Sequence, residues 1–369
     1  MFSLIRPVLF SLDPETSHDL VMTTLSWLSR SNALTRLIAR QTGARLPSLS
    51  CHVMGLDFPN PVGLAAGLDK QGNCANVMSA LGFGWVELGT VTPLPQPGNP
   101  KPRMFRLEQH HAIINRMGFN SCGLDAFLQN VSTTLPGIIK GINIGKNAIT
   151  PVDQASDDYL TALEAVYCHA DYVTVNISSP NTSNLRSLQQ DNALDQLLSA
   201  ICLKRQQLAD RHGMWVPLVL KIAPDLDRNQ INTIALLLRK HRIDGVAATN
   251  TTIARHSVIG HRFEYETGGL SGAPVRKQSS QVVMQLWQNL QGEIPIIGIG
   301  GVDSVESARE KFAAGADLIQ IYTGFIYRGP SVIREIVEGL AEACGDNEFS
   351  SYLQSLRCLP DTTSGRADE

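Results

Sequence analysis

Between residues 61 and 340, short apolar runs alternate with segments whose apolar residues recur every three or four positions. The runs are almost continuously apolar, which is typical of strands buried on both faces of a parallel sheet. The segments between them predict amphipathic helices; Leu194, Leu197 and Ile201 share one such face. Ser156 and Asn192 stand where helix N-caps are expected. The predicted strands are Val62–Ala66, Trp85–Thr90, Ile138–Ile144, Tyr172–Ile177, Val216–Ile222, Gly245–Thr249, Pro295–Ile299 and Leu318–Tyr322.

Eight strand–helix units in about 280 residues predict a closed (β/α)8 barrel, the TIM barrel of the α/β class, more naturally than an open sheet. Because the loops that follow the strands form the active face of such a barrel, we expect function at those loops.

The two ends of the chain do not fit the barrel pattern. Residues 1–45 predict two short amphipathic helices separated at Ser29–Asn32, and five Arg against three acids give them a charge of +2, whereas the whole chain carries −3. Residues 345–369 hold five acids, two Arg and few apolar residues, which predicts an acidic tail that is disordered or loosely attached. The expected domains are therefore a helical extension (1–45), the barrel (46–344) and the tail (345–369).

Composition excludes several classes of protein. Apolar residues make up 43% and charged residues 18% of the 369 positions, so the chain is globular. The chain lacks the excess of basic residues that is typical of nucleic-acid-binding proteins. No apolar run approaches the ~18 residues that a membrane span needs. The seven cysteines are far apart and form no C-x-x-C pair, and H-E-x-x-H is absent, so we expect free thiols, no metal site and no iron–sulfur cluster.

Polar residues concentrate where the predicted strands end. Asn143, Asn176 and Asn250 follow three different strands, and their amides suit a planar ligand that offers both donors and acceptors. Lys70 and Lys221 also end strands. A lysine there can hold negative charge on a ring or a phosphate, form a Schiff base, or lie solvated on the rim.

The last two barrel loops, "GIGGVDS" and "IYTGF", predict a phosphate site. Gly300 and Gly301 allow backbone N–H groups to approach an anion, Gly272 in "GGLSGAP" offers another, and the next helix opens near Ser304. The alternative is that these glycines only make tight turns. The proline-rich excursion Pro93–Pro102 has no helical period and predicts a lid or a wall of a binding site.

Eight motifs in order carry a resemblance to a known family: "GLAAGLDK", "NRMGFN", "GINIGKN", "NISSPNT", "KIAPDL", "ATNTT", "TGGLSG" and "GIGG". The sequence resembles class 2 dihydroorotate dehydrogenase, the quinone-using, membrane-associated form, from about residue 2 to residue 340. The resemblance implies a flavoprotein oxidoreductase of pyrimidine biosynthesis. Such an enzyme oxidises dihydroorotate to orotate with FMN in the barrel and a membrane quinone as electron acceptor.

The resemblance also implies roles for individual residues. Ser179 is the implied catalytic base, and because class 1 enzymes carry Cys on this loop, the serine favours class 2. The implied FMN contacts are Ala66, Gly67, Leu68, Asp69, Lys70, Thr90, Asn143, Asn176, Lys221, Thr249, Gly272, Gly301, Tyr322 and Thr323. The implied substrate contacts are Lys70, Asn115, Arg116, Met117, Gly118, Phe119, Asn176, Asn181, Asn250 and Thr251.

The N-terminal helices gain a role from the same resemblance, which implies a lipid-facing mouth through which quinone reaches the flavin. Basic and apolar residues without a spanning run suit interfacial binding, so we expect peripheral attachment to the cytoplasmic face of the cell membrane and no iron–sulfur partner subunit. Two alternatives remain: another FMN barrel, such as a class 1 or dihydropyrimidine-type dehydrogenase, and a non-catalytic phosphate-binding membrane adaptor.

Overall fold

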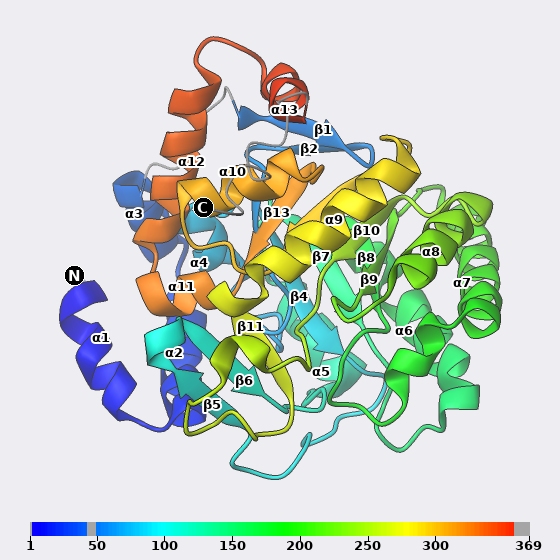
Figure 1. Ribbon diagram of the computed structural model, residues 1–369, viewed down its shortest axis with the longest axis horizontal. Coiled ribbons are helices and arrows are strands. Elements are labelled where there is room, and N and C mark those ends of the chain that lie inside the picture. The colour runs from blue at the N-terminus through cyan, green and yellow to red at the C-terminus, as the bar shows by residue number, and fades with distance from the viewer. Residues whose placement is uncertain (1, 43–48, 358–369) are drawn as a thin grey trace, which may run out of the picture.

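The computed structural model describes residues 2–42 and 49–357. Its centre is a closed barrel of eight parallel strands, which confirms the predicted (β/α)8 fold (Figure 1). All eight predicted strands are present, most of them one or two residues shorter than expected, because the terminal residues turn into the loops. Around the barrel the strands run β3 (Val62–Leu64), β4 (Trp85–Val91), β7 (Ile139–Ile144), β8 (Tyr172–Asn176), β9 (Leu218–Ile222), β10 (Gly245–Ala248), β12 (Ile296–Ile299) and β13 (Leu318–Ile321).

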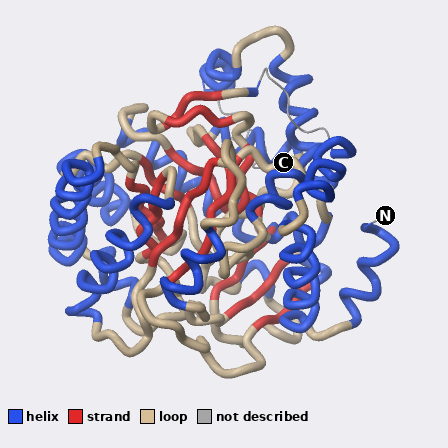
Figure 2. The backbone as a smooth tube through the Cα atoms, turned by 180° about the vertical axis from the view of Figure 1, so that it is seen from behind, coloured by secondary structure: helices blue, strands red, loops and turns tan. Residues whose placement is uncertain are grey.

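Helices surround the barrel and bury their apolar faces against it (Figure 2). Every residue of β4 is buried, as expected for a strand with the barrel interior on one side and helices on the other. The helices after the N-terminal segment are α4 (Ala75–Ala80), α5 (Gly123–Val131), α6 (Ala155–Val166), α7 (Asp191–His212), α8 (Arg228–Lys240), α9 (Arg276–Leu290), α10 (Val305–Ala313), α11 (Thr323–Arg328), α12 (Ser331–Cys344) and α13 (Phe349–Arg357).

Three helices precede the barrel where the sequence predicted two: α1 (Phe2–Ser11), α2 (Pro14–Ser29) and α3 (Asn32–Thr42). The break between α2 and α3 lies at Arg30–Ser31, as predicted. Helix α1 was missed, and it stands apart from the body of the molecule in both views (Figures 1 and 2). Asp13 caps α2 by accepting hydrogen bonds from the backbone N–H groups of Glu15 and Thr16.

Two small sheets close the barrel ends. The hairpin of β1 (Cys51–Val53) and β2 (Leu56–Phe58) packs Phe58 against Trp85 in the barrel core, with ring centroids 5.6 Å apart. A three-stranded antiparallel sheet of β5 (Met104–Leu107), β6 (Ala112–Asn115) and β11 (Gly269–Gly272) was not predicted. Strand β5 begins two residues after Pro102, so the excursion Pro93–Pro102 leads directly into this sheet.

Two expectations about helix ends and one about the tail are wrong. Helices α6 and α7 begin one residue before Ser156 and Asn192, because a 3₁₀ turn leads directly into α6 and the extended Gln190 is the N-cap of α7. Ser304, by contrast, is the N-cap of α10. Residues 349–357 of the predicted disordered tail form α13, since Phe349, Leu353 and Leu356 give it an apolar face that packs on the core. Residues 358–369 lie outside the described residues.

Candidate active site

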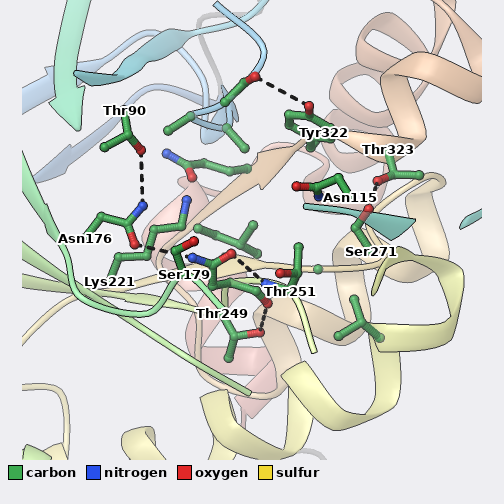
Figure 3. Close-up of a pocket in the computed structure, with 18 of the residues that line it drawn as sticks. Thr90, Asn115, Asn176, Ser179, Lys221, Thr249, Thr251, Ser271, Tyr322 and Thr323 are labelled. Atoms are coloured by element: carbon green, nitrogen blue, oxygen red, sulfur yellow. Dashed lines mark hydrogen bonds between the residues drawn. The ribbon is translucent and has the colours of Figure 1, made fainter. Parts of the chain in front are cut away.

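A pocket opens at the carboxyl ends of the barrel strands, where the sequence placed the active face (Figure 3). Its walls come from seven of the eight barrel strands or the loops that follow them, from β6 and the loop after it, and from β11, so residues far apart in the chain meet there. Lining side chains include Lys70, Thr90, Asn115, Asn176, Ser179, Asn181, Lys221, Thr249, Asn250, Thr251, Gln320, Tyr322 and Thr323.

A ladder of amides forms the base of the barrel pocket. The Asn176 amide nitrogen donates to the Asn143 carbonyl at 3.1 Å and to the Thr90 hydroxyl at 3.2 Å. The Asn250 amide nitrogen donates in turn to the Asn176 carbonyl at 3.3 Å. Asn143 and Asn176 are buried, so these bonds hold their amides in one orientation.

Ser179 lies on the loop after β8 and is buried at the pocket wall. Its hydroxyl oxygen accepts a hydrogen bond from the Asn181 backbone N–H at 3.2 Å. The Asn181 side chain donates to the Asn115 carbonyl at 3.3 Å, which ties this loop to the loop after β6. A serine, two asparagines and the pocket are therefore brought together as the sequence predicted.

The two lysines of the pocket have pKa values below those of exposed lysine. Desolvation, reinforced by the positive charge of Arg103, lowers the pKa of Lys70 to about 8. Burial also lowers the pKa of Lys221, against the opposing effect of the Glu87 carboxylate, whose oxygen lies 3.8 Å from the lysine nitrogen. Both lysines therefore give up their proton more readily than an exposed lysine does.

The far end of the pocket is built from backbone. Gly272, Gly300, Gly301 and Gly324 line it, and the Thr323 and Ser271 hydroxyls are hydrogen-bonded at 2.9 Å. At Gly272 φ is +96°, and a Cβ would lie 2.2 Å from the carbonyl oxygen of His111. No side chain fits at this position, so only glycine allows the backbone to take this path at the far end of the pocket.

Comparison with known proteins identifies the family. A family model described as dihydroorotate dehydrogenase matches residues 48–344. The chain belongs to the dihydroorotate dehydrogenase family. It is 58% identical over 342 residues to the dihydroorotate dehydrogenase (quinone) of Thiobacillus denitrificans, covering 93% of this chain and 100% of that one. The corresponding protein of Delftia acidovorans is 53% identical over 346 residues, covering 92% and 98%.

The fold agrees with solved structures of the family. The ligand-free DHODH structure from Eimeria tenella superposes with a TM-score of 0.83 at 36% identity, covering 94% of this chain and 100% of that one.

Four residues that the family resemblance assigned to ligands do not line the barrel pocket. Asn143 lies directly beneath it, in the amide ladder. The Asp69 carboxylate accepts hydrogen bonds from the Asn73 and Cys74 backbone N–H groups at the start of α4, so it organises the loop. The Arg116 guanidinium pairs with Glu266 at 2.5 Å. Leu68 faces a second cavity.

Three residues of the site were missed at the sequence level. Gln320 and Ser271 line the pocket, and Glu87 lies beneath it with its carboxylate within hydrogen-bond distance of Asn143 and Gln320. A sequence signal existed for two of them. Glu87 in "WVELGT" and Gln320 in "LIQIY" are polar residues inside otherwise apolar strands, where a buried polar group needs a partner.

The second cavity, of about 620 Å³, lies between the N-terminal helices and the barrel. Its lining is almost entirely apolar and includes Leu9, Val21, Leu25 and Phe325, and we call it the apolar cavity. The exceptions include His18 and Arg106. Desolvation, together with the charge of Lys70, lowers the pKa of His18 to about 3, so the imidazole is neutral near pH 7.

Proposed function

We propose that this protein oxidises dihydroorotate to orotate in pyrimidine biosynthesis, with FMN in the barrel pocket and a membrane quinone reached through the apolar cavity. One observation carries the proposal. The segment Ala66–Lys70 separates the two chambers: Ala66, Gly67 and Lys70 line the barrel pocket, whereas Leu68 lines the apolar cavity. A group bound in the pocket against this segment lies next to both a polar and an apolar site.

The barrel pocket fits FMN. Two buried oxygens beside it, Gln320 Oε1 and Thr251 Oγ1, have no hydrogen-bond partner among the described residues, so a ligand with polar edges would satisfy them. The glycine-lined end suits the phosphate. Bound there, FMN supplies the acceptor for the hydride that leaves ring carbon 6 of dihydroorotate. The residues proposed to hold it are the fourteen FMN contacts that the resemblance implies, with Leu68, Asp69 and Asn143, which do not line the pocket, acting through their neighbours.

The chain's own residues position the substrate and move its proton. We assign the ring contacts to Lys70, Asn176 and Asn250, and further contacts to Asn181, Thr251 and the Asn115–Phe119 segment. Ser179 accepts the proton from ring carbon 5, and the Ser179 hydroxyl proton must leave as it does so. The buried Thr182 hydroxyl, two residues beyond Pro180, has no partner among the described side chains and is a candidate relay.

The Ser179 assignment is tested by anaerobic reduction of the bound flavin by dihydroorotate. Ser179→Ala is expected to slow this reduction by about 10²–10⁴-fold, the usual contribution of a positioned base. Orotate affinity should change little, because the asparagines that hold the ring remain. Ser179→Cys should recover part of the rate, with a pH dependence set by the thiol. An alanine variant that keeps most of the rate would remove Ser179 from the mechanism.

The N-terminal helices are proposed to rest on the cytoplasmic face of the cell membrane. Leu4, Val8 and Trp27 are 79%, 64% and 64% exposed, which is unusual for large apolar side chains gathered on neighbouring helices. None of the helices in residues 2–42 and 49–357 has the length and apolar character needed to cross a bilayer.

Spectra of the purified protein separate this function from its rivals. We expect flavin absorbance that bleaches on adding dihydroorotate without an acceptor and returns on adding quinone. If the flavin absorbance returns with fumarate or a nicotinamide but not with quinone, the protein is another FMN barrel. If the purified protein contains no flavin, the result favours the non-catalytic phosphate-binding barrel.

A further inference from the structure

Glu87 is a buried carboxylate in the middle of β4, and its side chain is 0% exposed. One oxygen accepts a hydrogen bond from the Asn143 amide nitrogen at 2.7 Å. The other oxygen accepts from the Tyr172 hydroxyl at 3.0 Å, the Thr174 hydroxyl at 3.1 Å and the Gln320 amide nitrogen at 2.8 Å. The carboxylate thus joins the barrel core below to the floor of the barrel pocket above.

An ionised carboxylate can only accept hydrogen bonds, so it dictates the orientation of any amide that touches it. Asn143 must turn its NH₂ group to Glu87 and its carbonyl upward. That carbonyl then accepts from the Thr90 hydroxyl at 2.6 Å and from the Asn176 NH₂ group. Asn176 in turn presents its carbonyl to the NH₂ group of Asn250. Every amide of the ladder therefore points its NH₂ group toward Glu87.

Gln320 obeys the same constraint from the opposite side. Its NH₂ group donates to Glu87, so its carbonyl oxygen is the atom left without a partner in this pocket-lining residue. Asn143 and Gln320 lie on β7 and β13, which flank different parts of the barrel. A single carboxylate thus fixes two independent amides.

We propose that Glu87 is a positioning residue that sets the donor and acceptor pattern which the barrel pocket presents to the flavin and the substrate. This inference rests on the proposed function, because the identity of the two ligands comes from it. An amide placed the wrong way round offers a donor where the ligand needs an acceptor, and such a mismatch lowers affinity roughly tenfold to a hundredfold, which corresponds to about 1.4–2.8 kcal/mol.

Glu87→Gln tests the proposal because the two side chains have the same shape. The new amide has one accepting and one donating end, so it cannot accept from both Asn143 and Gln320. Either Asn143 or Gln320 must reverse. We expect the dissociation constants of FMN, orotate or both to rise about tenfold to a hundredfold, measured by flavin fluorescence and by the absorbance change on adding orotate.

Tyr172→Phe is the matched control. It removes another donor to the same carboxylate but touches neither pocket amide, so FMN and orotate affinity should stay within about twofold of wild type. An equal loss of affinity in Tyr172→Phe and Glu87→Gln would mean that the whole cluster is only structural and would overturn the proposal. Unchanged FMN and orotate affinity in Glu87→Gln would also overturn the proposal.

Loss of the negative charge beside Lys221 is the competing explanation, and a double variant separates the two. In Glu87→Gln combined with Gln320→Leu, the single accepting oxygen serves Asn143 without conflict. Amide orientation therefore predicts that adding Glu87→Gln to Gln320→Leu costs much less affinity than adding it to wild type. A charge effect predicts the same cost in both backgrounds, because Gln320 does not compensate Lys221.

Folding is followed in parallel by circular dichroism. A Glu87→Gln variant that fails to fold while its combination with Gln320→Leu folds and binds orotate supports the orientation conflict. Failure of both, with Tyr172→Phe intact, assigns Glu87 to charge compensation and overturns the proposal. Failure of the wild-type protein to bind FMN would instead contradict the proposed function and is seen before any variant is made.

Discussion

The desolvated lysines Lys70, Lys221 and Lys311 differ in what surrounds the amine. Lys70 and Lys221 line the barrel pocket, whereas Lys311 lies behind β12, fully buried. The Lys311 amine donates to the Ser279 hydroxyl at 3.0 Å and the Ser280 hydroxyl at 2.9 Å. No carboxylate forms an ion pair with it in the described part of the chain. The Lys311 amine is therefore surrounded only by neutral hydrogen-bond partners.

This environment predicts a pH-dependent stability that belongs to one residue. Burial lowers the pKa of Lys311 to about 7 from an ordinary value of 10.5. Between pH 7 and pH 10 the unfolded chain binds the proton and the folded chain does not, so folding becomes more favourable as the pH rises. From pH 7 to pH 9 the gain is about 2 kcal/mol in the free energy of unfolding.

Urea denaturation of wild type and Lys311→Met at pH 7 and pH 9 measures this gain. The difference in unfolding free energy between the two proteins should shift by about 2 kcal/mol in favour of wild type at the higher pH. Other groups titrate equally in both proteins and cancel. A constant difference across this range would contradict the prediction.

At the residue scale, much of the site is readable from the sequence and part of it is not. Residues that end strands, such as Asn176, Ser179 and Lys221, are placed by the barrel topology itself, so their meeting follows once eight strands are recognised. Asp69 also follows a strand, but its carboxylate caps backbone N–H groups. A polar side chain that follows a strand can line the pocket or cap nearby backbone N–H groups. The direction of the side chain decides between these two roles, and the order of residues does not determine that direction.

At the scale of elements, regular segments were predictable and irregular ones were not. The barrel strands are buried on both faces and mostly apolar, so their pattern is easily recognised. The β5–β6 hairpin was hidden because its strands are only four residues long and follow five prolines. Helix α1 contains Pro7, and α13 is nine residues long within an acidic tail, so local composition masked both.

Helix α2 is fastened to the substrate side of the barrel by a buried ion pair. The Arg103 guanidinium donates to the Glu15 carboxylate at 2.7 Å and to the backbone carbonyls of Pro97 and Asn99 at 2.7 and 2.8 Å. The Asn99 amide donates onward to the carbonyls of Arg116 and Asn181, at 3.0 and 3.1 Å. Two side chains thus connect the N-terminal helices to both proposed substrate loops.

Glu15→Gln is expected to loosen this connection. Removing one partner of a buried ion pair costs about 3–5 kcal/mol, and the neighbouring Lys101 adds a second unpaired charge. We expect a fall of that order in the free energy of unfolding and a severalfold weaker orotate affinity, because the Asn99 contacts relax. Glu338→Gln, in the exposed pair with Arg334, is the control and should change stability by less than about 0.5 kcal/mol.

The pH dependence of this pair has a defined sign. Burial raises the pKa of Glu15, but hydrogen bonds from Arg103 and Lys101 outweigh it and leave the pKa below its ordinary value of 4.5. The stabilisation is therefore complete above that value and is lost as the pH falls through the lower pKa of the folded state. Glu15→Gln should lose less stability than wild type between pH 5 and pH 3, and an equal loss would contradict the assignment.

At the scale of the whole molecule, the two chambers face different surroundings. The barrel pocket is bounded by ordered loops, whereas the apolar cavity is walled by helices whose outer residues are exposed and apolar. If these helices rest on lipid, an acidic substitution on their outer face should weaken membrane binding without touching the pocket. Burying one large apolar side chain contributes about 1.5–3 kcal/mol, so Trp27→Asp with Leu37→Asp, at two exposed residues that do not line the apolar cavity, should reduce affinity for phospholipid vesicles at least tenfold.

The decisive experiment compares flavin reduction by dihydroorotate with the reduction of two quinones, one held in vesicles and one soluble in water. In the Trp27→Asp, Leu37→Asp variant, anaerobic flavin reduction by dihydroorotate should match wild type, because neither residue lines the barrel pocket or the apolar cavity. Reduction of a long-chain quinone held in vesicles should fall with vesicle affinity, whereas reduction of a water-soluble short-chain quinone should not, because that quinone reaches the cavity from solution. Ile149→Asp, at a residue 80% exposed and outside the N-terminal helices, should leave all three rates unchanged. Equal losses with both quinones would place the defect in the cavity itself rather than at the lipid surface.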